Sequence, residues 1–199
     1  SGEEMPVTLL DDYVRELRLN RASGAGVPEL TDYIPLAELL NAVGKTLKPK
    51  VRCLMSLQNR EAGLPDGGLF TPDQFQRQSE ADPLPGQIPS RGVIEVKSAS
   101  ADAWVTADGT QVSRDWGEYR QVLVTNYRDF VLVGQDADGR PTKLETYRLA
   151  ESEAAFWAAA AQPVKLVEKH GDTFIEFLKR VMLHAAPLAS PKDVAWFLA

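Results

Sequence analysis

The residues best suited to chemistry are two charged side chains in an apolar segment of strand length, Glu95 and Lys97. Val93, Ile94 and Val96 around them are β-branched, which is typical of a β-strand. Because side chains alternate across a strand, we expect Glu95 and Lys97 on the same face. Unpaired buried charge is costly, so a charged pair in such a strand needs a compensating partner.

A divalent metal ion is one such partner. Asp66 lies upstream in a Pro-Asp-Gly-Gly turn, and with Glu95 it could offer carboxylate oxygens to Mg²⁺. The backbone carbonyl of Val96 could add a third oxygen, the ligand type that hard cations prefer, and Lys97 could lie beside a phosphate. Two plainer explanations stay open: a solvent-facing strand with an ion pair, and a turn of ordinary turn-forming residues.

The order of these residues, a Pro-Asp turn followed by a strand with Glu-x-Lys, resembles the PD-(D/E)XK nuclease superfamily. Longer stretches resemble the amino-terminal region of large restriction–modification polypeptides, in which a nuclease domain precedes an adenine-N6 DNA methyltransferase. These stretches are residues 39–44, 64–70, 92–97, 122–128 and 177–180, and the resemblance runs from about residue 28 to the end. The methyltransferase motifs themselves are absent from the chain.

The resemblance implies an α/β, restriction-endonuclease-like fold: a small mixed β-sheet flanked by helices, with a helical C-terminal extension. It implies Mg²⁺-dependent hydrolysis of DNA phosphodiester bonds, with Mn²⁺ as a substitute ion. Asp66, Glu95 and the Val96 carbonyl would hold the metal, and Lys97 would stabilise charge on the phosphate or orient the attacking water.

Two further residues enter through the resemblance. Glu29 precedes the first expected core helix, where members of the superfamily often carry a glutamate that reaches the metal or its water. Gln111 opens the helix after the Glu-x-Lys strand, where several branches place a glutamine that orients the water or the lysine. An acid at a helix start and a surface polar residue are the alternatives with no function.

The partners implied are double-stranded DNA and, in the parent chain, fused methyltransferase and target-recognition domains. A dimer is one way to cut both strands. The net charge of −6 counts against a free-standing DNA binder, since Lys and Arg make the phosphate contacts. Other readings are a catalytically silent docking or DNA-clamp module and, less favoured, a stand-alone repair nuclease.

The composition is that of a globular chain of 199 residues with 44% hydrophobic residues, enough for one domain with an appendage. No apolar run is long enough for a membrane span, and the start has no signal-peptide pattern. The single cysteine, Cys53, excludes an internal disulfide and suits a cytoplasmic protein. The uncapped apolar end suggests a chain cut from a longer polypeptide.

Periodicity predicts the elements and three segments. The segments are residues 1–28 (N-terminal helix and linker), 29–150 (nuclease core) and 151–199 (helical extension). We expect helices over 3–20, 31–47, 111–119, 151–161 and 173–185 with another from 190, strands over 51–57, 67–70, 92–97, 121–125, 129–134 and 142–147, and irregular chain over 71–91 and 98–108. Thr31 or Asp32 would cap the second helix.

Overall fold

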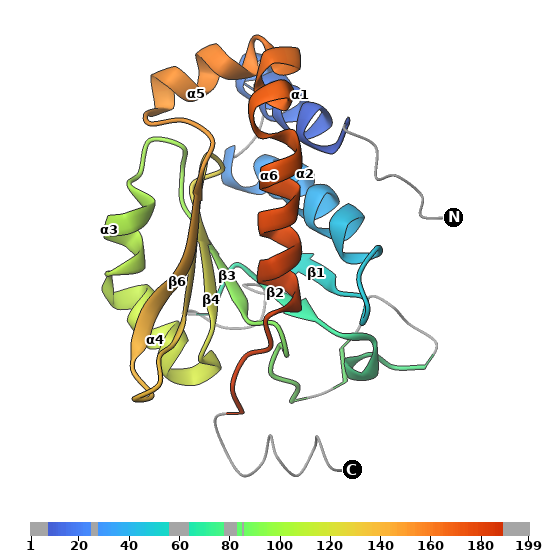
Figure 1. The fold of residues 1–199 in the computed structure, drawn as a ribbon, viewed down its shortest axis with the longest axis vertical. Helices are drawn as coiled ribbons and strands as arrows, with labels where there is room; N and C mark the ends of the chain where they lie inside the picture. Colours follow the sequence, from blue (N-terminus) through green and yellow to red (C-terminus); the bar gives the residue numbers. More distant parts are fainter. Residues whose placement is uncertain (1–7, 25–27, 56–63, 78–82, 85, 189–199) are drawn as a thin grey trace.

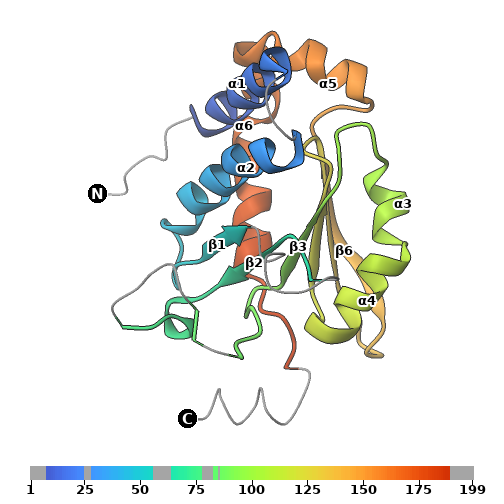
Figure 2. The same cartoon turned by 180° about the vertical axis from the view of Figure 1, so that it is seen from behind.

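A mixed β-sheet with helices on both faces forms the structure (Figure 1). The computed structural model describes residues 8–24, 28–55, 64–77, 83–84 and 86–188, and the side chains of all of these except residues 8 and 28–30. Helices α1, α2 and α6 cover one face, and α3 and α4 cover the other, as both views show (Figures 1 and 2). The expected α/β class, with a sheet flanked by helices and a long helix towards the C-terminus, is confirmed.

The sheet has six strands in chain order, β1 to β6. They are β1 (Arg52–Met55), β2 (Gly67–Phe70), β3 (Val93–Val96), β4 (Val122–Thr125), β5 (Asp129–Gln135) and β6 (Pro141–Arg148). Only β3 and β4 pair in parallel; the other neighbours are antiparallel. A parallel pair needs a crossover, and α3 (Ala103–Ala107) with α4 (Thr110–Tyr119) supplies it.

The larger core lies between the sheet and the helices α1 (Thr8–Ser23), α2 (Pro28–Gly44), α5 (Glu153–Ala160) and α6 (Pro163–Leu183). Phe130 of β5 meets two aromatic rings of α6, with ring centroids 5.1 Å from Phe174 and 6.4 Å from Phe177. Such tilted aromatic contacts add to the burial energy. Both N-terminal helices and α6 therefore belong to the same hydrophobic core as the sheet.

A smaller core lies under α3 and α4, and it determines the direction of β3 side chains. Val93 packs in this smaller core with Val112 and Trp116, whereas Ile94 and Val96 belong to the larger one. Alternation therefore directs Glu95, two residues after Val93, towards α4.

Gly92 fixes the start of β3. Its φ is +92°, and a Cβ at this position would lie 2.7 Å from the carbonyl oxygen of Gln121. That same carbonyl accepts a hydrogen bond from the Val93 amide at 3.0 Å. Only glycine allows both the left-handed backbone and this close approach, so it helps to set the register that places Glu95.

Most expected elements are confirmed within one or two residues, including the helix over 111–119 and the strands on either side of residues 126–128. No described helix is long and apolar enough to span a membrane. The division into three segments stays a prediction. Residues 3–7 and 56–57 and the helix expected from 190 lie outside the described residues.

Two expected helix starts are wrong. Helix α2 begins at Pro28, so Thr31 and Asp32 lie inside it rather than capping it. Asp32 instead accepts a hydrogen bond from Asn20 Nδ2 of α1 at 3.1 Å, which joins the two helices. Helix α6 begins ten residues earlier than expected, at Pro163, a residue suited to a first helical turn.

The segment 98–108 is not wholly irregular, because α3 forms within it. The Asp102 carboxylate accepts hydrogen bonds from the amides of Trp104 (2.9 Å) and Val105 (3.1 Å). This N-cap stabilises a five-residue helix that is too short to show a helical period in the sequence.

Candidate active site

Two buried carboxyls lie opposite each other across β2 and β3. The antiparallel register pairs Gly67 with Ile94, and one further step along each strand places Asp66 opposite Glu95. Each of these acids is only 5% exposed. The sheet thus brings together two residues that are 29 positions apart in the sequence.

The Asp66 carboxylate is held from both sides. The Tyr33 hydroxyl of α2 donates to Oδ1 at 2.7 Å, and the Val96 amide donates to Oδ2 at 2.7 Å. Hydrogen bonds to a carboxylate are short and strong, so they fix its orientation. Residues from two elements, α2 and β3, therefore converge on Asp66.

A third acid, Asp115 of α4, completes the cluster. It is 2% exposed and accepts a hydrogen bond from Gln111 Nε2 at 3.1 Å on Oδ1. Its buried Oδ2 has no hydrogen-bond partner among the described residues. Sequence reasoning missed Asp115, although one signal was present: the acid falls in the apolar stripe formed by Val112 and Trp116, where a charge needs a reason.

Proximity and burial change the acidity of this cluster. Burial, the contact with Asp115 and the charge of Asp66 together raise the pKa of Glu95 to about 10. Burial also raises the pKa of Asp115, while its contacts with Glu95 and Gln111 act in the opposite direction. At neutral pH the cluster therefore favours an added positive charge, either a proton or a cation.

Lys97 immediately follows β3 and is exposed. Its amide donates to the Thr125 carbonyl at 2.9 Å, which continues the parallel pairing with β4. Together with Tyr33 and Val96, which hold Asp66, it lines a hollow of about 280 Å³. Within the described part of the chain, no salt bridge joins Lys97 to Asp66 or Glu95. Its access to a phosphate at this site stays a prediction.

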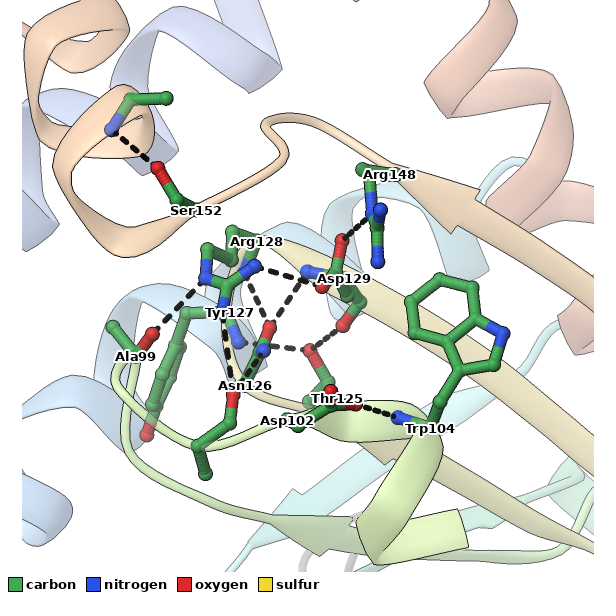
Figure 3. Close-up of polar contacts among 12 residues, drawn as sticks. Ala99, Asp102, Trp104, Thr125, Asn126, Tyr127, Arg128, Asp129, Arg148 and Ser152 are labelled. Carbon is green, nitrogen blue, oxygen red and sulfur yellow. Dashed lines mark hydrogen bonds and ion pairs between the residues drawn. The ribbon is translucent and has the colours of Figure 1, made fainter.

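The loop after Lys97 is fastened to the turn between β4 and β5 (Figure 3). Arg128 donates from Nε to the Ala99 carbonyl at 3.0 Å and from an NH2 group to the Ala101 carbonyl at 3.3 Å. Asn126 Nδ2 donates to the same Ala101 carbonyl at 2.8 Å. These contacts fix the chain within a few residues of Lys97.

The cluster's chemistry fits a hard divalent cation, since it offers carboxylate oxygens, one of them buried without a partner. Glu95 contacts both other acids. The three carboxylates are nevertheless not arranged to hold one metal ion together, and the described residues contain no other group of three or more acidic, His or Cys side chains placed to do so. A cation would thus rest on two carboxylates with backbone oxygen and water. The side chain of Glu29, in the first turn of α2, lies outside the described residues.

The structure therefore brings Asp66 and Glu95 together and adds Asp115. It places Gln111 against Asp115, so any influence of Gln111 on the site passes through that acid. The role of the Val96 carbonyl as a metal ligand stays a prediction. The role of Val96 that the structure does show is the amide hydrogen bond to Asp66.

The sequence matches no family model and no curated protein. Among solved structures, the chain is similar to one in the cryo-EM structure of a DrdV–DNA complex, with a TM-score of 0.48 and 16% sequence identity. The match covers 81% of this chain and 14% of that chain, so the protein spans about a seventh of the length of the structure it matches.

Proposed function

We propose that this chain is a nuclease domain that hydrolyses DNA phosphodiester bonds with Mg²⁺, or with Mn²⁺ as a substitute. One observation carries the proposal: Asp66 and Glu95 are buried opposite each other, with Asp115 beside them, in the Asp then Glu-x-Lys order of the resemblance. Strongly perturbed acids that share a site are typical of functional centres. Lys97, directly after β3, supplies the lysine of the Glu-x-Lys pattern.

Asp66, Glu95 and the Val96 carbonyl would hold the ion, with Asp115 and Glu29 as supporting acids. When bound, the ion would lower the pKa of a water molecule and offset the charge of the phosphate. Tyr33 and the Val96 amide keep the Asp66 carboxylate in one orientation.

Two other residues act around this centre. Gln111 holds Asp115 against Glu95 through its hydrogen bond to Oδ1. Lys97 would place its ammonium group beside the phosphate oxygens, where it would stabilise charge that develops in the transition state.

The same proposal includes a restriction context, with methylation and target recognition in other domains of a parent polypeptide and a dimer for double-strand cleavage. It rests on the resemblance of the sequence stretches described above. A silent docking or DNA-clamp module is the alternative, and it predicts that no cleavage occurs with any metal ion.

Nicking of supercoiled plasmid DNA in Mg²⁺ or Mn²⁺ tests this function. We expect slow cleavage with little sequence preference, because no base-reading module is recognisable in the chain. Lys97→Ala should lower the rate by about 10²–10³-fold, the usual effect of losing one transition-state stabiliser. Its melting temperature should stay the same, because the lysine is exposed and makes no salt bridge in the described chain.

Lys165→Ala is the matched control, since it removes an exposed lysine from α6 and should keep the wild-type rate. Absence of cleavage by the wild-type chain in both metals would favour the silent module. Full activity of Lys97→Ala would show that Lys97 is not a catalytic residue.

A further inference from the structure

Cationic side chains gather around an open hollow of about 920 Å³ beside β1, β2 and the end of α2. Among the described residues that line it are Lys45, Lys50, Arg52 and Arg77, against a single acid, Asp73. The chain as a whole carries a net charge of −6. Positive charge is therefore concentrated at this hollow in an otherwise acidic protein.

The wall of the hollow formed by residues 70–77 is fixed by the buried side chain of Gln74. Its Oε1 accepts hydrogen bonds from the amides of Thr71 (3.2 Å) and Ser90 (3.0 Å), and its Nε2 donates to the Ile88 carbonyl at 2.7 Å. These contacts hold the short helical turn Pro72–Gln74 against the chain that leads into β3. The wall is thus built before any ligand arrives.

The opposite wall is fixed as well. Asn41 of α2 donates to the Cys53 carbonyl at 3.1 Å and accepts from the Cys53 amide at 2.8 Å. This reciprocal pair joins the end of α2 to β1, and so it sets the positions from which Lys45 and Lys50 extend. Both lysines are exposed and make no salt bridge within the described chain.

Strand β2 connects this hollow to the acidic cluster. Asp66 precedes β2, whereas Phe70 at its end lines the hollow and pairs with Arg52 of β1. Four residue steps along a strand measure about 13 Å. A DNA duplex carries one phosphate per about 1.7 Å of its axis, so several phosphates lie within that distance of a phosphate at the acidic cluster.

We propose that this basic hollow binds the sugar-phosphate backbone of DNA beside the cleavage position. The inference deepens the proposed function and rests on it, because the acidic cluster defines where the reacting phosphate lies. The cations extend from the end of α2 over β1 to the segment after β2, an arrangement suited to an extended polyanion. This chain would then make some of the contacts to the DNA backbone itself.

The test is the salt dependence of binding to a short duplex oligonucleotide, followed by fluorescence anisotropy without divalent metal. The double variant Lys45→Ala/Lys50→Ala is compared with Lys165→Ala/Lys169→Ala, which removes the same charge from exposed positions of α6. Each lost phosphate contact lowers the slope of log K against log salt by about 0.9. We expect the first variant to lose about 2 from the slope, and the second to keep the wild-type slope.

Equal slopes and affinities for the two double variants would overturn the proposal, as would a wild-type chain that does not bind DNA at low salt. The readout does not depend on cleavage. If the basic hollow binds DNA as expected but no metal supports cutting, the nuclease function fails while the DNA contact stands. Melting temperatures of both variants should equal that of the wild type, because all four lysines are exposed.

Discussion

Two buried acids of the same sheet, Glu95 on β3 and Asp129 on β5, have opposite surroundings. Asp129, 1% exposed, forms salt bridges with Arg128 at 2.9 Å and Arg148 at 3.0 Å (Figure 3). Glu95, 5% exposed, has two other acids as its polar neighbours, and no salt bridge to it occurs in the described chain. Within the described residues, two arginines offset the charge of Asp129, whereas no cationic side chain forms a salt bridge with Glu95.

We propose that this difference distinguishes a structural acid, Asp129, from a functional one, Glu95. A buried charge that has its counter-charge in the fold stabilises a local arrangement, here the loop after Lys97 and the turn before β5. Buried acids that lie close together disfavour one another's charged form, and such acids are typical of sites where a ligand supplies positive charge. This contrast, more than the Glu-x-Lys pattern, supports the proposed site around Glu95.

Asp129→Ala should give the largest effect on stability. It leaves Arg128, which is buried, without its carboxylate partner, and removal of one partner from a buried ion pair typically costs about 3–5 kcal/mol. Chemical denaturation at neutral pH measures this loss in the free energy of unfolding. Asp108→Ala, which breaks an exposed pair with Lys143, is the control, with an expected change of about 0–1 kcal/mol. An equally small change in the free energy of unfolding for both variants would show that Asp129 does not have this structural role.

Glu95→Gln should have an effect of the opposite sign, and its size should depend on pH. Because the pKa of Glu95 is raised from 4.5 to about 10, the folded chain keeps a proton that the unfolded chain releases between these values. Stability without metal should therefore fall as the pH rises through that window, by at most about 1.4 kcal/mol per pH unit.

The glutamine variant, which has no proton to lose, should lack most of this slope and melt above the wild type at alkaline pH. Thermal melts in a metal chelator over this pH range measure it. The control Glu176→Gln changes an exposed acid of α6 and should keep the wild-type slope. A glutamine variant with the unchanged slope would mean that Glu95 is not the group that holds the proton.

The sequence was informative where a pattern is local. The β-branched run with charges at alternate positions identified β3, and the order of Asp66 and Glu95 predicted that they meet. Asp115 was not predicted, because its role depends on how α4 packs against β3, a contact that spacing along the chain does not encode. The basic hollow has the same origin, since its cations come from the chain between α2 and β1, from β1 itself and from the segment after β2.

Short elements also limited the prediction. Helix α3 depends on one capping acid, Asp102, and α2 begins at a proline that the sequence equally allows in a linker. The hydrogen bonds of Arg128 to the loop after Lys97 join positions about 27 to 29 apart, so no local pattern reveals them.

We propose that the opposed carboxyls of Asp66, which precedes β2, and Glu95 of β3 bind a divalent cation. Isothermal titration calorimetry with Mg²⁺ and Mn²⁺ at neutral pH tests it most directly, because it needs neither DNA nor cleavage. We expect saturable binding by the wild-type chain and by Lys97→Ala, and strongly weakened binding by Glu95→Ala, which removes a ligand oxygen. Equal binding by the wild type and Glu95→Ala, or no binding of either metal by the wild type, would contradict the account.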